Sequence, residues 1–198
     1  MMTLYSFGPS PFGRKIKVLL AELGMKDQVQ VEPANTLEDP DYLLSSNPLG
    51  KIPVLKTPDE GDIFNSSLIA RYVLEKAGAG AAVRANWDDL KLEALVDGAL
   101  DAAILIVYKG RFEIPGENVF YDRQRDKINR TLDRLETMVD GFDLDRVPSL
   151  GELHVGVMGE YLDFRQPVAD WRTSRPKLSA YVDALGQRPS FQATQPTN

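Results

Sequence analysis

The sequence predicts an α/β domain over residues 1–77 and an all-α domain over residues 86–198. Before residue 77, short segments that alternate apolar and polar residues are interspersed with helical patterns. After residue 86, every segment has apolar residues spaced three and four apart, as in amphipathic helices. Residues 78–85 begin with Gly-Ala-Gly-Ala-Ala and are expected to be a linker.

The N-terminal domain is expected to have the element order βαβαββα. Its elements are a strand at 3–7, a helix at 11–23, a strand at 28–32, a short helix at 38–46, a hairpin of 54–56 with 62–64, and a third helix. Ser10 is a good N-cap for the first helix, and Gly24 ends it. The first two strands are expected to be parallel, joined by a βαβ crossover. Ser66 is expected to cap the third helix, whose buried face is predicted to carry Leu68, Ile69, Tyr72 and Val73.

The C-terminal domain is expected to be a helical bundle. Its helices are predicted at 86–111, 120–142, 153–164 and 177–186, followed by a polar tail at 187–198. Ser149-Leu150-Gly151-Glu152 matches the S-x-x-E capping box that begins many helices.

The composition excludes several kinds of site and partner. There is no cysteine, and His154 is the only histidine, so we expect no metal centre and no cysteine nucleophile. A net charge of −6 argues against nucleic acid or an anionic membrane as the main partner. No signal-peptide pattern and no run of about 20 apolar residues is present. With 43% hydrophobic and 26% charged residues, the chain is expected to be a soluble cytoplasmic protein.

The segment 47–55, N-P-L-G-K-I-P-V-L, places Pro53 inside a strand-like sequence. Proline cannot donate to a sheet ladder, and a cis Ile52–Pro53 bond is one resolution. With S-P-F-G-R-K at 10–15 and N-S-S at 65–67, this segment resembles the N-terminal half of cytosolic glutathione S-transferases, where the proline is cis. The resemblance implies a thioredoxin-like N-terminal domain followed by the helical domain of that fold.

C-terminal patterns extend the resemblance over essentially the whole chain. Y-L-D-F-R at 161–165, D-W-R at 170–172 and R-P-S-F at 188–191 are similar to a bacterial serine-type subgroup of the family. We interpret these residues as structural, with aromatic rings packing on aliphatic side chains and Arg165 or Arg172 pairing with acids.

The resemblance implies that glutathione is the co-substrate and that Ser10 is the catalytic residue. A free thiol has a pKa of roughly 8.5, and each unit of lowering needs about 1.4 kcal/mol. Ser10 can donate a hydrogen bond to the sulfur, and the helix that it begins adds positive potential. Two alternatives stay open: Ser10 is only an N-cap, or Tyr5 is the activator. The place of Tyr5 within a strand suggests a packed side chain, and the Ser-Pro-Phe context favours Ser10.

Further glutathione-binding residues are implied by the same resemblance: Phe12, Lys51, Ile52, Pro53, Asn65 and Ser66. Ile52 would bind the cysteinyl part through its backbone, Ser66 the γ-glutamyl carboxylate, and Lys51 the glycyl carboxylate. An ordinary solvent-exposed turn lysine is an equal interpretation of Lys51. Family members usually carry Asp or Glu where this chain has Asn65. We therefore expect glutathione binding to be weaker by about 1 kcal/mol, unless an acid of a partner subunit compensates.

Tyr108 and Arg111 are expected to contact a second substrate, a small electrophile, between the domains, although both also fit ordinary interface residues. The resemblance implies a homodimeric glutathione transferase with a role in detoxification. A non-catalytic glutathione- or ligand-binding protein, an interaction module, and a glutathione-dependent peroxidase or dehalogenase are alternatives on the same fold.

Overall fold

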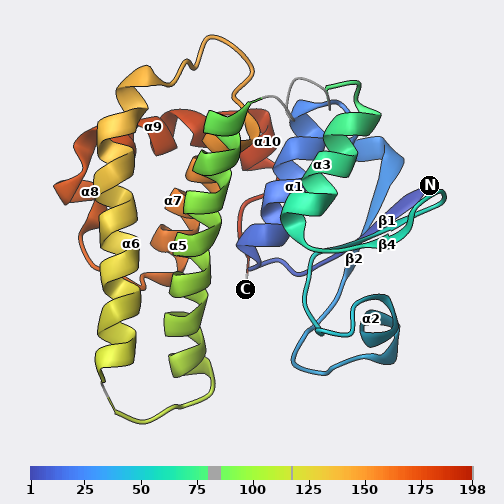
Figure 1. Cartoon of the computed structure of the whole chain (residues 1–198), viewed down its shortest axis with the longest axis horizontal. Helices are drawn as coiled ribbons and strands as arrows, with labels where there is room; N and C mark the ends of the chain where they lie inside the picture. The colour runs from blue at the N-terminus through green and yellow to red at the C-terminus, as the bar shows by residue number, and fades with distance from the viewer. Residues whose placement is uncertain (80–85, 117, 198) are drawn as a thin grey trace. The chain divides into compact units, whose positions relative to one another are not determined.

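The computed structural model describes residues 1–79, 86–116 and 118–197. The chain forms two compact units, one made of Met1–Trp87 with Pro189–Asn198 and the other of Asp88–Arg188 (Figure 1). Most of the linker expected at 78–85 lies outside the described residues. The segment from Pro189 onward was expected in the helical domain but belongs to the first unit, because it packs against the first helix.

A four-stranded sheet forms the centre of the first unit (Figure 1). The strands are β1 (Met2–Ser6), β2 (Val29–Pro33), β3 (Val54–Thr57) and β4 (Gly61–Ile63). Their order in the sheet is β2-β1-β3-β4. β1 is parallel to β2 and antiparallel to β3, and β3 pairs with β4 as a hairpin. The predicted crossover and hairpin are therefore confirmed.

Helices cover both faces of this sheet. The helices of the first unit's N-terminal part are α1 (Pro11–Glu22), the 3₁₀ turn η1 (Lys26–Gln28), α2 (Asp41–Ser46) and α3 (Ser66–Lys76). α1 and α3 pack against each other, and α2 lies on the opposite side of the sheet (Figure 1). Successive residues of a strand point to opposite faces, so Leu4 and Tyr5 serve different layers. Tyr5 packs with Val54 and with Leu43 of α2.

α3 differs from the helix expected from the sequence in its N-cap and in its buried face. Asn65, not Ser66, is the N-cap, and Ser66 is the first helical residue. Asn and Ser are equally good N-caps, so the sequence alone did not separate them. Leu68 is 52% exposed instead of buried. Tyr72, also predicted on the buried face, is only half-buried. Both residues lie outside the buried stripe, which has three- and four-residue spacing and consists of Ser66, Ile69, Ala70, Val73 and Leu74.

The predicted polar tail is wrong for its first part, because residues 189–192 form a short helix, α10 (Pro189–Gln192), on α1. Phe191 is fully buried, and the guanidinium carbon of Arg14 lies 5.4 Å from its ring centroid. Nη2 of Arg14 donates to the backbone oxygen of Phe191 at 3.3 Å. Ser190 donates a hydrogen bond to Glu22 of α1. A helix of a single turn is too short for periodicity to reveal.

The second unit is built from helices. They are α5 (Trp87–Arg111), α6 (Val119–Met138), the 3₁₀ turn η2 (Val139–Gly141), α7 (Leu150–Arg165), α8 (Trp171–Ser174) and α9 (Pro176–Gly186). α9 packs on α6 and α7. α7 is buried from Leu150 to Gly159. The predicted capping box is present, with Ser149 accepting from the N–H of Glu152 and Glu152 accepting from the N–H of Ser149.

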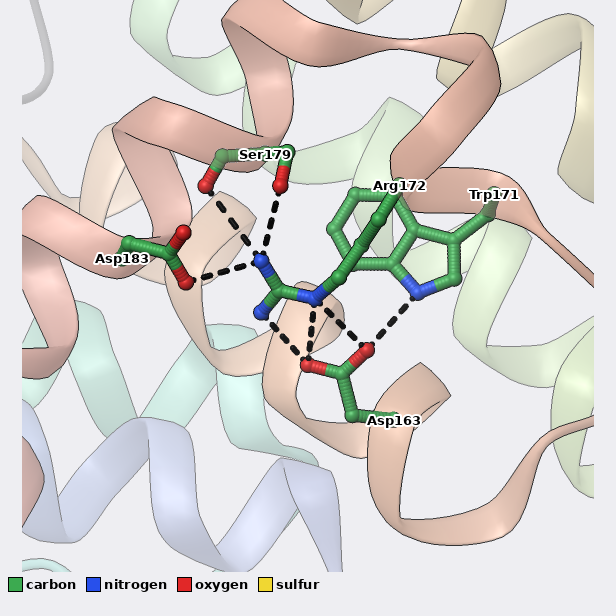
Figure 2. A network of polar contacts seen from close by, with 5 residues as sticks. All are labelled: Asp163, Trp171, Arg172, Ser179 and Asp183. Atoms are coloured by element: carbon green, nitrogen blue, oxygen red, sulfur yellow. Dashed lines mark hydrogen bonds and ion pairs between the residues drawn. The ribbon is translucent and has the colours of Figure 1, made fainter.

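Arg172 of α8 connects α7 and α9 through a polar network (Figure 2). Its Nη2 donates to Asp163 at 2.6 Å, and its Nη1 donates to Asp183 at 2.8 Å and to the Ser179 Oγ at 2.9 Å. The indole N–H of Trp171 donates to the same Asp163 carboxylate at 3.0 Å. The prediction that Arg172 pairs with acids is confirmed.

Candidate functional site

Ser10 lies at the start of α1 as its N-cap. Its Oγ accepts a hydrogen bond from the backbone N–H of Gly13 at 3.2 Å. Pro11 occupies the first helical position, and the first turn of α1 contains no acidic residue. The hydroxyl oxygen therefore already accepts one bond, which leaves the hydroxyl hydrogen to donate to a bound group. The positive end of the helix is not offset by a nearby carboxylate of its own first turn.

Close contact between α1 and β1 fixes the position of this helix start. A Cβ on Gly13 would lie 2.1 Å from the Oγ of Ser6 and 3.2 Å from its Cβ. Only glycine allows the helix backbone to approach the end of β1 at this distance. No role was expected for Gly13 from the sequence, because a single glycine in a helical pattern does not reveal what lies beside it.

The turn before Pro53 is organised by Asn47, which is 2% exposed. Its Nδ2 donates to the backbone oxygen of Lys51 at 2.8 Å, and its Oδ1 accepts from the N–H of Leu49 at 3.1 Å. Gly50 has a φ of +61°, which glycine adopts without strain. The Ile52–Pro53 bond is cis, as the resemblance implied. The turn thus has a defined backbone that precedes β3 directly.

The residues predicted around Pro53 differ in exposure. Pro53 is buried, Ile52 is half-buried and Lys51 is exposed. Ile52 packs against the cluster that contains Tyr5 and Val54. Tyr5 itself is only 8% exposed, with its ring centroid 5.2 Å from that of Tyr42. This packing agrees with the interpretation of Tyr5 as a core residue.

The start of α3 brings together Asn65, Ser66 and a residue that sequence reasoning missed, Lys15. The Oδ1 of Asn65 accepts from the N–H of Leu68 at 3.1 Å. Ser66 is 5% exposed. Lys15 of α1 is 2% exposed, and its Nζ lies 3.4 Å from the Oγ of Ser66 and 3.3 Å from that of Ser67. No sequence pattern links position 15 to position 66, because the contact depends on how α1 packs against α3.

The N-terminal ends of α1 and α3 suit an anionic ligand. α1 carries Arg14, Lys15 and Lys17, and neither α1 nor α3 has an acid in its first turn. Burial, and then the nearby Arg14, lower the pKa of Lys17 below its usual value. Phe12 is half-buried in the first turn of α1. Helix N-termini with adjacent hydroxyl and ammonium groups fit the carboxylates and thiolate of a small acidic peptide.

Tyr108 and Arg111, the predicted second-substrate residues, lie near the end of α5. The guanidinium carbon of Arg111 is 5.7 Å from the ring centroid of Tyr108, and the Tyr108 ring meets Phe112 edge to face at 5.5 Å. Tyr161 of α7 is 4% exposed. Burial raises the pKa of Tyr161 to about 12, with the neighbouring Tyr108 adding to this and Arg165 and Arg111 opposing it. Tyr161 is therefore a buried, neutral side chain, which agrees with the structural role expected for it.

Within the described ranges, no group of three or more His, Cys, Asp or Glu residues is placed to hold a metal ion. Over the same residues, no helix has both the length and the apolar character needed to cross a membrane.

Family models match both parts of the chain. The glutathione S-transferase N-terminal domain matches residues 9–76, and the glutathione S-transferase C-terminal domain matches residues 118–184. A relative from Escherichia coli K12, described as the uncharacterized GST-like protein YibF, is 35% identical over 98% of each chain. A probable elongation factor 1-gamma from Arabidopsis thaliana is 43% identical over 29% of this chain and 14% of its own length.

Solved structures of similar proteins cover the whole chain. A glutathione transferase family member from Pseudomonas fluorescens Pf-5, with bound glutathione, has a TM-score of 0.88 and 31% identity over 100% of both chains. A glutathione transferase family member from the same organism, with bound S-(propanoic acid)-glutathione, has a TM-score of 0.83 and 30% identity over 100% of both chains. A glutathione S-transferase from Methylobacillus flagellatus with bound glutathione has a TM-score of 0.80 and 29% identity, again over both whole chains.

Proposed function

Because the chain belongs to the glutathione S-transferase family, we propose that it transfers the glutathione thiolate to a small electrophile, with Ser10 stabilising the thiolate. The observation that carries this proposal is the hydrogen bond from the Gly13 N–H to the Ser10 Oγ. It occupies the oxygen as an acceptor and leaves the hydroxyl hydrogen for the sulfur. The similar solved structures that contain bound glutathione support glutathione as the ligand.

In this mechanism Ser10 acts by favouring the ionised sulfur. Its O–H donates to the thiolate, and the N-terminal end of α1 supplies positive potential. A neutral donor together with a helix end contributes about one to two pKa units, which raises the thiolate fraction roughly 8- to 25-fold at pH 7. The thiolate then attacks the electrophilic carbon, a sulfur–carbon bond forms, and the leaving group or the newly formed anion takes the displaced electron pair.

The first unit also supplies the residues proposed to bind the other parts of the glutathione molecule. The backbone of Ile52 beside Pro53 binds the cysteinyl part, and Ser66 at the start of α3 binds the γ-glutamyl carboxylate. Lys51, which is exposed, pairs with the glycyl carboxylate. Phe12 covers the thiol side, and Asn65 offers an acceptor to the γ-glutamyl ammonium group.

The electrophile is assigned to the helical unit, where Tyr108 supplies a hydroxyl group and Arg111 a cation. The S-(propanoic acid)-glutathione held by a neighbour shows that the neighbour accepts an acidic group on the sulfur. We infer a similar tolerance here, because Arg111 carries a positive charge beside Tyr108. The protein functions as a cytoplasmic homodimer in this proposal, with detoxification as its role.

An interaction module on the same fold is the second candidate. The similarity of part of this chain to elongation factor 1-gamma favours it, because that relative is named as a translation factor, not as a transferase. A binding protein that holds glutathione without turnover is a further alternative, as is peroxidase or dehalogenase activity at the same site.

Thermal unfolding with and without glutathione, combined with turnover assays, separates these functions. At a hundredfold excess of glutathione over its Kd, binding adds about 2.7 kcal/mol of stability. A rise in Tm together with conjugation of an aryl halide or an α,β-unsaturated carbonyl compound supports the transferase. No rise at millimolar glutathione would favour the interaction module. A rise without conjugation would favour the binding protein, unless a peroxide or haloacid panel gives turnover.

A further inference from the structure

Lys15 lies between α1 and the N-terminal end of α3, where it contacts two hydroxyl groups at once. Its Nζ is 3.4 Å from the Ser66 Oγ and 3.3 Å from the Ser67 Oγ, and the residue is 2% exposed. A lysine ammonium has three N–H donors and no acceptor. In both contacts, therefore, the serine oxygen must be the acceptor.

The direction of these hydrogen bonds determines which kind of group the Ser66 hydroxyl can still bind. A serine hydroxyl has one hydrogen and two lone pairs. Because a lone pair of Ser66 faces Lys15, its hydrogen is directed to a different group, which must be an acceptor. Without the ammonium, the same hydroxyl could turn and accept a bond instead. Lys15 thus sets Ser66 as a donor at the positive end of an 11-residue helix.

We propose that Lys15 is a positioning residue for glutathione, which holds the Ser66 hydroxyl in the orientation that donates to the γ-glutamyl α-carboxylate. The inference rests on the proposed function, since it assigns Ser66 to that carboxylate. The ligand group it selects is an anionic acceptor. A cationic group, or a group without an acceptor atom, gains nothing from a hydroxyl held as a donor.

The test compares two ligands by calorimetric titration of the whole protein. One is glutathione, and the other is 4-aminobutanoyl-cysteinyl-glycine, in which hydrogen replaces the γ-glutamyl α-carboxylate. Lys15→Met should weaken glutathione binding about tenfold, which corresponds to a hydrogen bond with a charged partner. Binding of the analogue should change less than about twofold, because it lacks the acceptor. Lys15→Arg should recover most of the glutathione affinity.

Three further variants separate positioning from a general loss of structure or charge. Lys17→Met removes a cation from the same helix and should affect both ligands equally. In a Ser66→Ala background, Lys15→Met should have little further effect on glutathione affinity, because the two residues act through one bond. In a Ser67→Ala background, Lys15→Met should still weaken glutathione binding.

The outcomes distinguish this inference from the function on which it rests. A selective loss of glutathione affinity, absent in Ser66→Ala, supports the positioning role. Equal losses for both ligands, or no loss for either, would overturn that role while leaving the glutathione site in place. If the unmodified protein binds no glutathione, the inference and the proposed function fall together. Selective binding without any conjugation would overturn the transferase reaction alone.

Discussion

Gly13 of α1 and Ser6 of β1 are in contact so close that a Cβ on Gly13 would lie 2.1 Å from the Ser6 Oγ. The contact sets where α1 begins, and therefore where its N-cap, Ser10, is held relative to the sheet. The fold thus positions the proposed catalytic hydroxyl through the close approach of the Gly13 backbone to the Ser6 side chain.

Gly13→Ala should displace the start of α1 and lower both stability and glutathione affinity. An overpacked core position costs typically about 1–3 kcal/mol, which urea denaturation measures. Adding Ser6→Ala should recover most of the loss, because it removes the nearest atom. Gly98→Ala is the matched control, since nothing lies within 4 Å of its Cβ. There the same change in a helix should stabilise the protein by about 1 kcal/mol. Equal effects at positions 13 and 98 would refute the role of the contact.

Asn65→Asp should strengthen glutathione binding. Aspartate caps a helix as well as asparagine does, so α3 keeps its start. The added charge lies near the expected position of the γ-glutamyl ammonium group, where a charge-assisted bond is about twice as strong as a neutral one. A gain of about 1 kcal/mol corresponds to roughly fivefold in Kd. Asn118→Asp, at the N-cap of α6, should leave affinity unchanged. An unchanged or weaker affinity for Asn65→Asp would mean that Asn65 serves only as a cap.

Phe191→Ala should destabilise the first unit although position 191 lies near the end of the sequence. Its ring is fully buried beside Arg14 of α1. Removing a buried phenylalanine ring costs about 3–5 kcal/mol, which should be measurable as a lower urea midpoint. Phe120, which is 47% exposed, provides the comparison, and its replacement by Ala should cost less than about 1 kcal/mol. Similar costs for both substitutions would contradict the packing of α10 on α1.

Asp163→Asn should destabilise the second unit more than Asp183→Asn does. Asp163 accepts hydrogen bonds from two nitrogens of Arg172 and from the indole N–H of Trp171. Asp183 accepts a hydrogen bond only from Nη1 of Arg172, and its side chain is 65% exposed. Losing bonds to a charged group costs about 1.5–3 kcal/mol at the better-protected carboxylate, and an exposed ion pair contributes about 0–1 kcal/mol. Urea denaturation of both variants measures the difference. The reverse order of stabilities would show that the network in Figure 2 does not depend on Asp163.

Local patterns predicted most of the fold. The strands, the hairpin, the capping box at Ser149 and the long helices follow from alternation, spacing and cap residues. The cis bond before Pro53 followed from the resemblance. Features that depend on contacts between distant segments were missed or misassigned. The contacts of Lys15 with Ser66, of Arg14 with Phe191 and of Gly13 with Ser6 form only when distant segments pack together. No residue spacing in the sequence predicts them. The cap of α3 was misplaced by one residue because Asn65 and Ser66 are equally suitable.

The pKa of the glutathione thiol bound to the protein tests the central claim most directly, and the ultraviolet absorbance of the thiolate as a function of pH measures it. In the unmodified protein we expect this pKa to lie about one to two units below the free value of roughly 8.5. Ser10→Ala should raise it toward the free value while affinity changes little, and conjugation should then require a higher pH. Asn118→Ala, which removes a different helix cap, should leave the thiol pKa unchanged. An identical thiol pKa in the unmodified protein and in Ser10→Ala would contradict the account.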